Sequence, residues 1–164
     1  MKVYTLKRQQ LIARPRDEVF RFFESPDNLE KITPQAVGFN ILTPRPINMQ
    51  AGTVLDYTIR LAGLSVRWTT LISEYDPPCR FRDVSLRGPY SFWHHTHTFE
   101  EVEGGTLMTD EVRYAVPFGP LGRIVHALWV KRQLKQIFDF RAEVIERMLE
   151  RTAPSNPKSE STTP

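Results

Sequence analysis

The stretch from Pro120 to Glu150 constrains the fold most, because its apolar residues recur with the spacing of one helical face. These apolar residues are Leu121, Ile124, Val125, Leu128, Leu134, Ile137, Phe138, Val144, Ile145, Met148 and Leu149. Pro120 suits the first turn of a helix, and Pro154 forbids its continuation. A helix of about 30 residues is roughly 45 Å long. It cannot bury such a stripe alone, so the preceding residues must supply a broad apolar partner.

Strands are the partner that the preceding residues predict, because their apolar residues alternate with a period of two between turn residues. The predicted strands are Lys2–Ala13, Val37–Leu42, Thr53–Leu61, Ser65–Glu74, Arg80–Leu86, Phe92–Val102 and Thr106–Val116. Two short helices separate the first two strands: one spans Asp17–Glu24, and the second begins after Ser25 and ends before Pro34. We therefore predict an α+β fold, in which a seven-stranded curved antiparallel sheet wraps around the long C-terminal helix. The short helices close one end, and a cavity remains where sheet and helix cannot touch.

Composition fits one folded domain. The chain has 164 residues, 40% of them hydrophobic, and residues 151–164 are rich in Pro, Ser and Thr. We predict a single domain over residues 1–150 and a disordered tail over 151–164. A net charge of +3 is too small to indicate nucleic-acid binding. The single cysteine, Cys79, excludes an intrachain disulfide, and no apolar run is long enough for a signal peptide core or a membrane span. We expect a cytoplasmic protein, whose oligomeric state the sequence leaves open.

Histidines in the strand Phe92–Val102 are the first candidates for chemistry. Alternation places Trp93, His95, His97 and Phe99 on one face, and the two aromatic residues indicate that this face points inward. Buried imidazoles need polar partners, since an unpaired buried polar group costs on the order of a few kcal/mol.

Asp83 and Asp110, on neighbouring predicted strands, are the candidate partners of His95 and His97. The four residues either form an imidazole–carboxylate pair that moves a proton, or a polar network that fixes strand register, which is the commoner role. The His-x-His spacing also fits two metal ligands, with either aspartate as the third, but this spacing has low specificity. We therefore predict neither a metal nor a cofactor.

Cations accompany apolar residues near the start of the long helix. Arg123, Lys131, Arg132 and Lys135 lie beside Trp129 and Val130. This pattern fits a contact with a membrane surface or an acidic partner, but a solvated helix face is the commoner cause of such a pattern.

Several motifs together resemble those of a known superfamily. They are Asp76-Pro77-Pro78, Phe81-Arg82-Asp83, Gly88-Pro89-Tyr90, the segment Trp93–Phe99 and the segment Val116–Gly122. Over residues 1–150 the chain resembles a bacterial branch of the START/Bet v 1-like (SRPBCC) proteins, which include polyketide cyclases and coenzyme Q-binding proteins. The resemblance implies a helix-grip fold with an internal pocket for a hydrophobic or amphipathic small molecule. It implies no catalytic residue.

Three functional hypotheses follow. The first is a protein that binds a hydrophobic or amphipathic ligand such as a lipid, a quinone or a polyketide-like compound. The second is a cyclase or dehydratase in which His95 or His97 acts as general base, with Asp83 and Asp110 as the supporting carboxylates. The third is a partner-binding module without a small ligand. The expected ligand-binding residues are Tyr57, Trp68, Phe81, Asp83, Trp93, His95, His97, Phe99, Asp110 and Tyr114.

Overall fold

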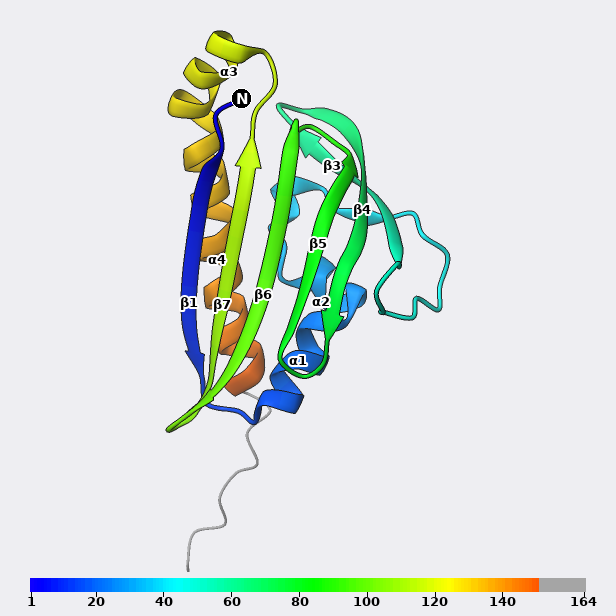
Figure 1. The fold of residues 1–164 in the computed structure, drawn as a ribbon, viewed down its shortest axis with the longest axis vertical. Coiled ribbons are helices and arrows are strands. Elements are labelled where there is room, and N and C mark those ends of the chain that lie inside the picture. The colour runs from blue at the N-terminus through cyan, green and yellow to red at the C-terminus, as the bar shows by residue number, and fades with distance from the viewer. Residues whose placement is uncertain (151–164) are drawn as a thin grey trace, which may run out of the picture.

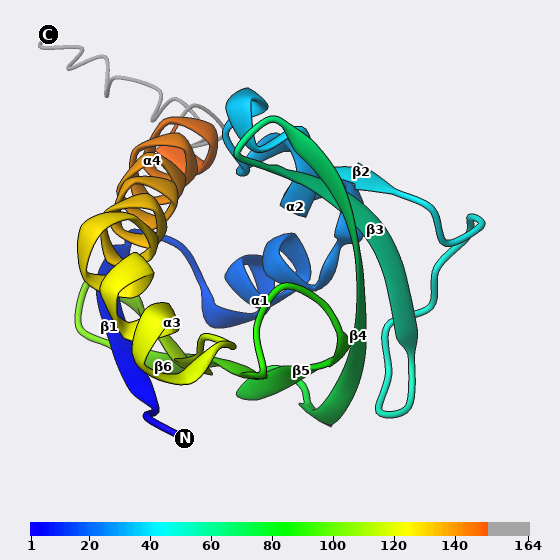
Figure 2. The ribbon, with the colours of Figure 1, turned by 90° about the horizontal axis from the view of Figure 1, so that it is seen from above.

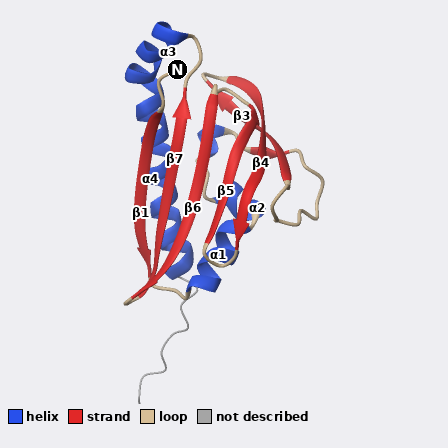
Figure 3. Ribbon diagram, in the orientation of Figure 1, coloured by secondary structure: helices blue, strands red, loops and turns tan. Residues whose placement is uncertain are grey.

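A computed structural model describes residues 1–150 of the chain as one sheet, two short helices and one long helix (Figure 1; Figure 3). The strands are β1 (Tyr4–Ile12), β2 (Asn40–Ile41), β3 (Val54–Leu61), β4 (Leu64–Asp76), β5 (Arg80–Arg87), β6 (Phe92–Val102) and β7 (Gly105–Ala115). The helices are α1 (Arg16–Glu24), α2 (Pro26–Lys31), the 3-10 turn η1 (Gln35–Val37), α3 (Gly119–Val125), the π-helical turn η2 (His126–Val130) and α4 (Lys131–Glu150). The tail predicted over 151–164 lies outside the described residues.

The sheet has seven strands in the order β1-β7-β6-β5-β4-β3-β2, and every neighbouring pair is antiparallel. Successive hairpins build the part from β3 to β7, while β1 joins β7 at the edge, as predicted. A two-residue turn joins β3 to β4, with Ala62 at φ 50° and Gly63 at φ 83°. Positive φ at both positions is what a tight hairpin turn of this kind requires.

The predicted long helix is confirmed. The helical segments α3, η2 and α4 follow one another without a gap from Gly119 to Glu150. Figure 2 shows the sheet curving around a central space, with α4 along one side of it, and Figure 1 shows α1 and α2 toward the end of the molecule opposite α3. This is the helix-grip arrangement that the sequence predicted. No helix among residues 1–150 is long and apolar enough to cross a membrane.

The prediction that one continuous apolar stripe of this helix is buried was wrong for its first turns. Leu121, Ile124, Val125 and Leu128 are exposed. Figure 1 shows α3 at the end of the molecule beyond β7, where no strand remains to cover it. Leu134, Phe138 and Ile145 of the predicted stripe are buried, and the other buried positions of the helix are Gly122, His126, Val130 and Arg141.

The predicted strand Val37–Leu42 was also largely wrong. Only Asn40 and Ile41 are extended, and the chain before them forms η1. Gly38 has φ 55°, a left-handed conformation that ends the 3-10 turn and delays the strand. The other predicted strands agree with the structure to within two residues at each end.

Two apolar clusters fill the space between sheet and helices. One surrounds α1, where Phe20 packs edge-on against Phe81 and Phe99 with ring centroids 5.8 and 5.4 Å away. The other lies toward the opposite end, where Trp68 and Trp93 of the sheet belong to the same cluster as Leu134 and Phe138 of α4. The second cluster surrounds the candidate site.

Candidate ligand-binding site

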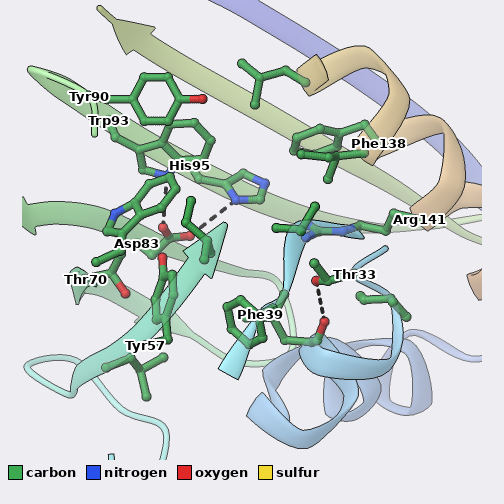
Figure 4. Close-up of a pocket in the computed structure, with 18 of the residues that line it drawn as sticks. Thr33, Phe39, Tyr57, Thr70, Asp83, Tyr90, Trp93, His95, Phe138 and Arg141 are labelled. Carbon is green, nitrogen blue, oxygen red and sulfur yellow. Dashed lines mark hydrogen bonds and ion pairs between the residues drawn. The ribbon is translucent and has the colours of Figure 1, made fainter. Parts of the chain in front are cut away.

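A cavity of about 140 Å³ lies between the concave face of the sheet and α4 (Figure 4). Its wall is mainly apolar and aromatic, and a few polar side chains converge on it. Predicted ligand-binding residues that line the cavity are Tyr57, Trp68, Asp83, Trp93, His95 and His97. Four other predicted residues, Phe81, Phe99, Asp110 and Tyr114, do not line it. Phe81 and Phe99 pack against α1, Asp110 contacts the two histidines, and the Tyr114 hydroxyl lies 2.9 Å from Nε2 of His126.

Strand register explains how the histidines and aspartates meet. Asp83 of β5 lies opposite His95 of β6, and His97 of β6 lies opposite Asp110 of β7. Directly opposed residues of antiparallel strands project from the same face. The four side chains therefore form one buried cluster, as the sequence predicted.

Each imidazole lies between two carboxylates. Oδ2 of Asp83 is 3.4 Å from Nδ1 of His95 and 3.8 Å from Nε2 of His97. Oδ1 of Asp110 is 3.1 Å from Nε2 of His95 and 2.7 Å from Nδ1 of His97. The first of these Asp110 contacts is a hydrogen bond, whereas the second is a close ion-pair contact without hydrogen-bond alignment. The indole N–H of Trp93 donates to Oδ1 of Asp83 over 3.2 Å, which orients that carboxylate.

Arg141 of α4 is a cavity residue that the sequence analysis missed. Its side chain lines the cavity, is 7% exposed and places its guanidinium carbon 5.0 Å from the ring centroid of Phe138. A signal was present, because Leu134, Phe138, Arg141 and Ile145 follow the i, i+4, i+7, i+11 spacing of a buried helical face. A cation in that register identifies a buried charge facing the sheet.

Comparison with known protein families shows the family to which this chain belongs. Residues 4–150 match the family described as polyketide cyclase / dehydrase and lipid transport. This chain belongs to that family. No curated protein matches the chain.

Solved structures share the fold of this family member. TTHA0849 from Thermus thermophilus has a TM-score of 0.73 at 17% identity, with 92% of this chain and 100% of that chain covered. The ZhuI aromatase/cyclase from Streptomyces sp. R1128 has a TM-score of 0.73 at 13% identity, with 94% and 98% covered. Ara h 8.0201 has a TM-score of 0.64 at 17% identity, with 92% and 100% covered. These similarities show a shared fold, and together with the family match over residues 4–150 they agree with the START/Bet v 1-like (SRPBCC) resemblance of the sequence motifs.

The pKa values of the cluster are set by competition between burial and charge. Burial alone would lower the pKa of His97, but the charge and hydrogen-bonding capacity of Asp110, with Asp83, raise it above its usual value. Burial and the neighbouring His97 lower the pKa of His95, against the opposing effect of both carboxylates. Burial would raise the pKa of each aspartate, but the two histidines lower it. The pKa values of the two imidazoles are therefore shifted in opposite directions, and His97 holds a proton more strongly than His95 does.

Metal binding at this cluster has a geometric basis among the described residues. Asp83, His95 and His97 each offer one ligand atom, and these atoms lie within 4.8 Å of one another. Two imidazoles and one carboxylate form a donor set used by zinc and by non-haem iron. The carboxylates already lie within ion-pair distance of all four ring nitrogens, so the four side chains can also share protons with one another as a network.

Proposed function

We propose that this chain binds a hydrophobic or amphipathic small molecule in the cavity between the sheet and α4. The observation that carries the proposal is the lining of that cavity, in which an aromatic and aliphatic wall surrounds a few convergent polar side chains. Such a combination is typical of small-molecule sites, where apolar contacts supply affinity and polar groups fix orientation. The proposed binding residues are Tyr57, Trp68, Asp83, Trp93, His95, His97, Phe138 and Arg141.

The family match supports this proposal, because the family description names lipid transport beside polyketide cyclases and dehydrases. The size of the cavity limits the ligand. A volume of about 140 Å³ suits one aromatic ring and is below the roughly 300 Å³ at which drug-sized sites begin. A longer lipid, quinone or polyketide-like ligand therefore requires the lining side chains to move apart.

Native mass spectrometry of protein purified gently from its own cells tests the proposal. We expect an adduct that disappears on denaturation and whose mass gives the ligand class. A second readout uses Trp68 and Trp93, which line the cavity, in a Trp129→Phe variant that removes the exposed third tryptophan. Failure to find an adduct, together with unchanged tryptophan fluorescence across a panel of aromatic and aliphatic ligands, would contradict the proposal.

A second candidate function is a cyclase or dehydratase, favoured by two neighbouring buried imidazoles that contact both carboxylates and whose pKa values are shifted in opposite directions. In such an enzyme His95 accepts a proton, His97 donates one, and the carboxylates stabilise the charges that form. Once a ligand is identified, His95→Gln and His97→Gln distinguish binding from catalysis. In an enzyme these variants lower turnover by a much larger factor than they lower ligand affinity, whereas in a carrier the wild type itself shows no turnover.

The third hypothesis, a partner-binding module without a small ligand, ranks below these two. It predicts an interior that is packed throughout, and a lined cavity between sheet and helix is the opposite of that expectation.

A further inference from the structure

Arg141 is an unusual residue for the buried face of a helix. Its neighbours on that face, Leu134, Phe138 and Ile145, are apolar, and its own side chain is 7% exposed. A guanidinium remains charged at any ordinary pH, so it cannot escape the cost of burial by losing its proton. Burial of a charge is tolerated only where the charge is paired.

No described residue supplies that pair. Among residues 1–150, Arg141 forms neither a salt bridge nor a hydrogen bond, and its Nε is buried without a partner. Asp110 and Asp83 act on the Arg141 charge electrostatically, but both carboxylates are in direct contact with His95 and His97. The guanidinium of Arg141 lies over the face of the Phe138 ring.

Arg14 shows how this chain treats an arginine of similar burial. Its side chain is 11% exposed, and both Nε and one terminal nitrogen donate to the carbonyl of Leu149 over 2.9 and 2.7 Å. Its other terminal nitrogen lies 3.7 Å from Glu18. The contrast indicates that Arg141 is left unpaired at a specific place, the cavity wall, and not by a general tolerance of the fold.

The side chain of Arg141 points into the cavity. Figure 4 shows its side chain reaching from α4 toward the middle of the cavity, with Asp83 and His95 on the far wall. Tyr57, Trp68 and Trp93 provide flat apolar surfaces around the same space. A planar guanidinium presents paired N–H groups that match the two oxygens of a carboxylate.

We propose that the ligand of this cavity is an amphipathic anion of about the size of a monocyclic aromatic acid, whose carboxylate pairs with Arg141 while its ring lies against the aromatic wall. This inference rests on the proposed function and adds the charge, size and orientation of the ligand. Both carboxylates of the cluster are already in contact with His95 and His97, so the cavity accepts the anion at its Arg141 side.

A pair of probes that differ only in charge tests the proposal. The probes are 4-fluorobenzoate and its neutral isostere 4-fluorobenzamide, observed by fluorine NMR with the intact protein at pH 7. We expect the benzoate to bind at least tenfold more tightly than the benzamide. In Arg141→Met the benzoate affinity falls at least tenfold, and the benzamide affinity stays within about twofold, since charge-assisted hydrogen bonds are lost and the apolar wall remains.

Two further variants complete the design. Arg132→Met removes an exposed arginine of the same helix and leaves both affinities unchanged. Arg141→Lys keeps the charge without the planar fork and retains part of the preference. Equal binding of both probes by the wild type, or an equal loss of both in Arg141→Met, overturns the anion proposal but leaves small-molecule binding intact. If neither probe binds, the proposed ligand size, that of a monocyclic aromatic acid, is overturned. The native mass measurement decides separately whether the protein binds a small molecule.

A separate observation concerns the start of the long helix. Six of the fourteen large hydrophobic residues that are exposed among residues 1–150 fall within 118–129. We call this set the apolar end: Phe118, Leu121, Ile124, Val125, Leu128 and Trp129. Phe118 and Leu128 are 79% and 76% exposed. A cluster of this kind marks an interaction surface more often than isolated exposed residues do.

Charge indicates what covers the apolar end. Residues 117–138 contain four Lys or Arg and no Asp or Glu. Arg123, Lys131 and Arg132 are exposed and form no salt bridge with a residue in the described part of the chain, whereas Lys135 is paired with Asp139. Large apolar residues beside unpaired cations on one helical segment are the combination that binds at the surface of an anionic bilayer.

We propose that the apolar end docks on an anionic lipid surface. A groove lined by Leu128, Trp129 and Arg132 continues along α4 to Gln133 and Ile137, and the last two residues also line the cavity. Docking by the apolar end therefore places this groove, and the side of the cavity next to it, close to the lipid.

Co-sedimentation with vesicles tests the docking proposal. We expect binding to vesicles of phosphatidylcholine with about one-third phosphatidylglycerol, no binding to phosphatidylcholine alone, and weaker binding at high salt. Leu128→Ser and Arg132→Glu each reduce bound protein at least fivefold, while Leu64→Ser, at a residue 72% exposed in the β3–β4 hairpin, has no effect. Absence of binding to anionic vesicles, or a concentration-dependent dimer that Leu128→Ser abolishes, overturns the proposal.

Discussion

Oδ1 of Asp110 lies 2.7 Å from Nδ1 of His97, and both side chains are almost completely buried. The two residues belong to neighbouring strands and stand directly opposite each other in the β6–β7 register. A charge pair formed this deep in the fold has two consequences, one for proton binding and one for stability.

The proton-binding consequence is a raised pKa of His97. Although burial opposes it, Asp110 raises the pKa of His97 above 6.5, so we expect the imidazole of the wild type to titrate above that value. Asp110→Asn removes the charge and lowers this pKa, which histidine ring NMR measures directly. A pKa of His97 that is unchanged in Asp110→Asn would assign the shift to another group.

The raised pKa of His97 also makes the free energy of unfolding depend on pH in a defined direction. The folded state binds the His97 proton more tightly than the unfolded chain, so the stabilisation is fully present below pH 6.5 and is lost as the pH rises through the folded pKa. The free energy of unfolding of the wild type relative to Asp110→Asn should therefore decrease across that window. A constant difference over the whole range contradicts the linkage.

The stability consequence is a high cost of breaking the pair. Asp110→Ala leaves buried imidazoles without their partner, and loss of one member of a buried charge pair costs about 3–5 kcal/mol. Urea unfolding at pH 6 measures this loss. Asp139→Ala is the control, because Asp139 pairs with Arg8 and Lys135 at the surface, where each such pair contributes less than about 1 kcal/mol. Similar losses in the two variants would show that burial of the Asp110 pair has no special weight.

The aromatic core around α1 gives another large effect. Phe20 is 2% exposed and contacts Phe81, Phe99 and Tyr75 through edge-on ring pairs. Phe20→Ala is expected to lower the free energy of unfolding by about 3–5 kcal/mol, since it removes buried contacts and leaves a cavity. Phe118→Ala, at a residue 79% exposed, should change it by no more than about 0.5 kcal/mol. A loss above about 1 kcal/mol in Phe118→Ala would show that this residue is packed in solution.

The sequence predicted most of the architecture because periodicity is a local signal. The alternation Trp93, His95, His97, Phe99 specifies which face of β6 is buried, and the structure confirms it. The helical spacing of residues 120–150 specifies a long helix. The spacing does not specify where the sheet ends, which is why Leu121 and Leu128 were wrongly expected to be buried.

The candidate site was predictable only in part, for a similar reason. Sequence alternation places Phe81, Phe99 and Tyr114 on the concave face, but the length of each strand and the position of α1 determine which concave residues meet the cavity. Arg141 was missed because the buried face of the helix was defined by its apolar residues alone, although the spacing of Arg141 from Phe138 and Ile145 places it on that face. The short length of β2 was missed for a different reason. Gly38 adopts a left-handed conformation, which shortens a strand that the neighbouring residues favour.

Removal of Arg141 is expected to stabilise the protein, whereas removal of Asp110 or Phe20 is expected to destabilise it. Arg141→Met replaces a buried charge that has no partner among the described residues with an apolar side chain of similar length, so the ligand-free protein should gain stability, by about 1 kcal/mol or more. Arg14→Met removes hydrogen bonds to Leu149 from an arginine of similar burial, and should lose about 1.5–3 kcal/mol. Urea unfolding of both variants at pH 7 gives the comparison. If Arg141→Met is destabilised as much as Arg14→Met, Arg141 is a structural residue whose charge the fold requires. If it is stabilised, the fold retains an unfavourable charge that a ligand anion neutralises.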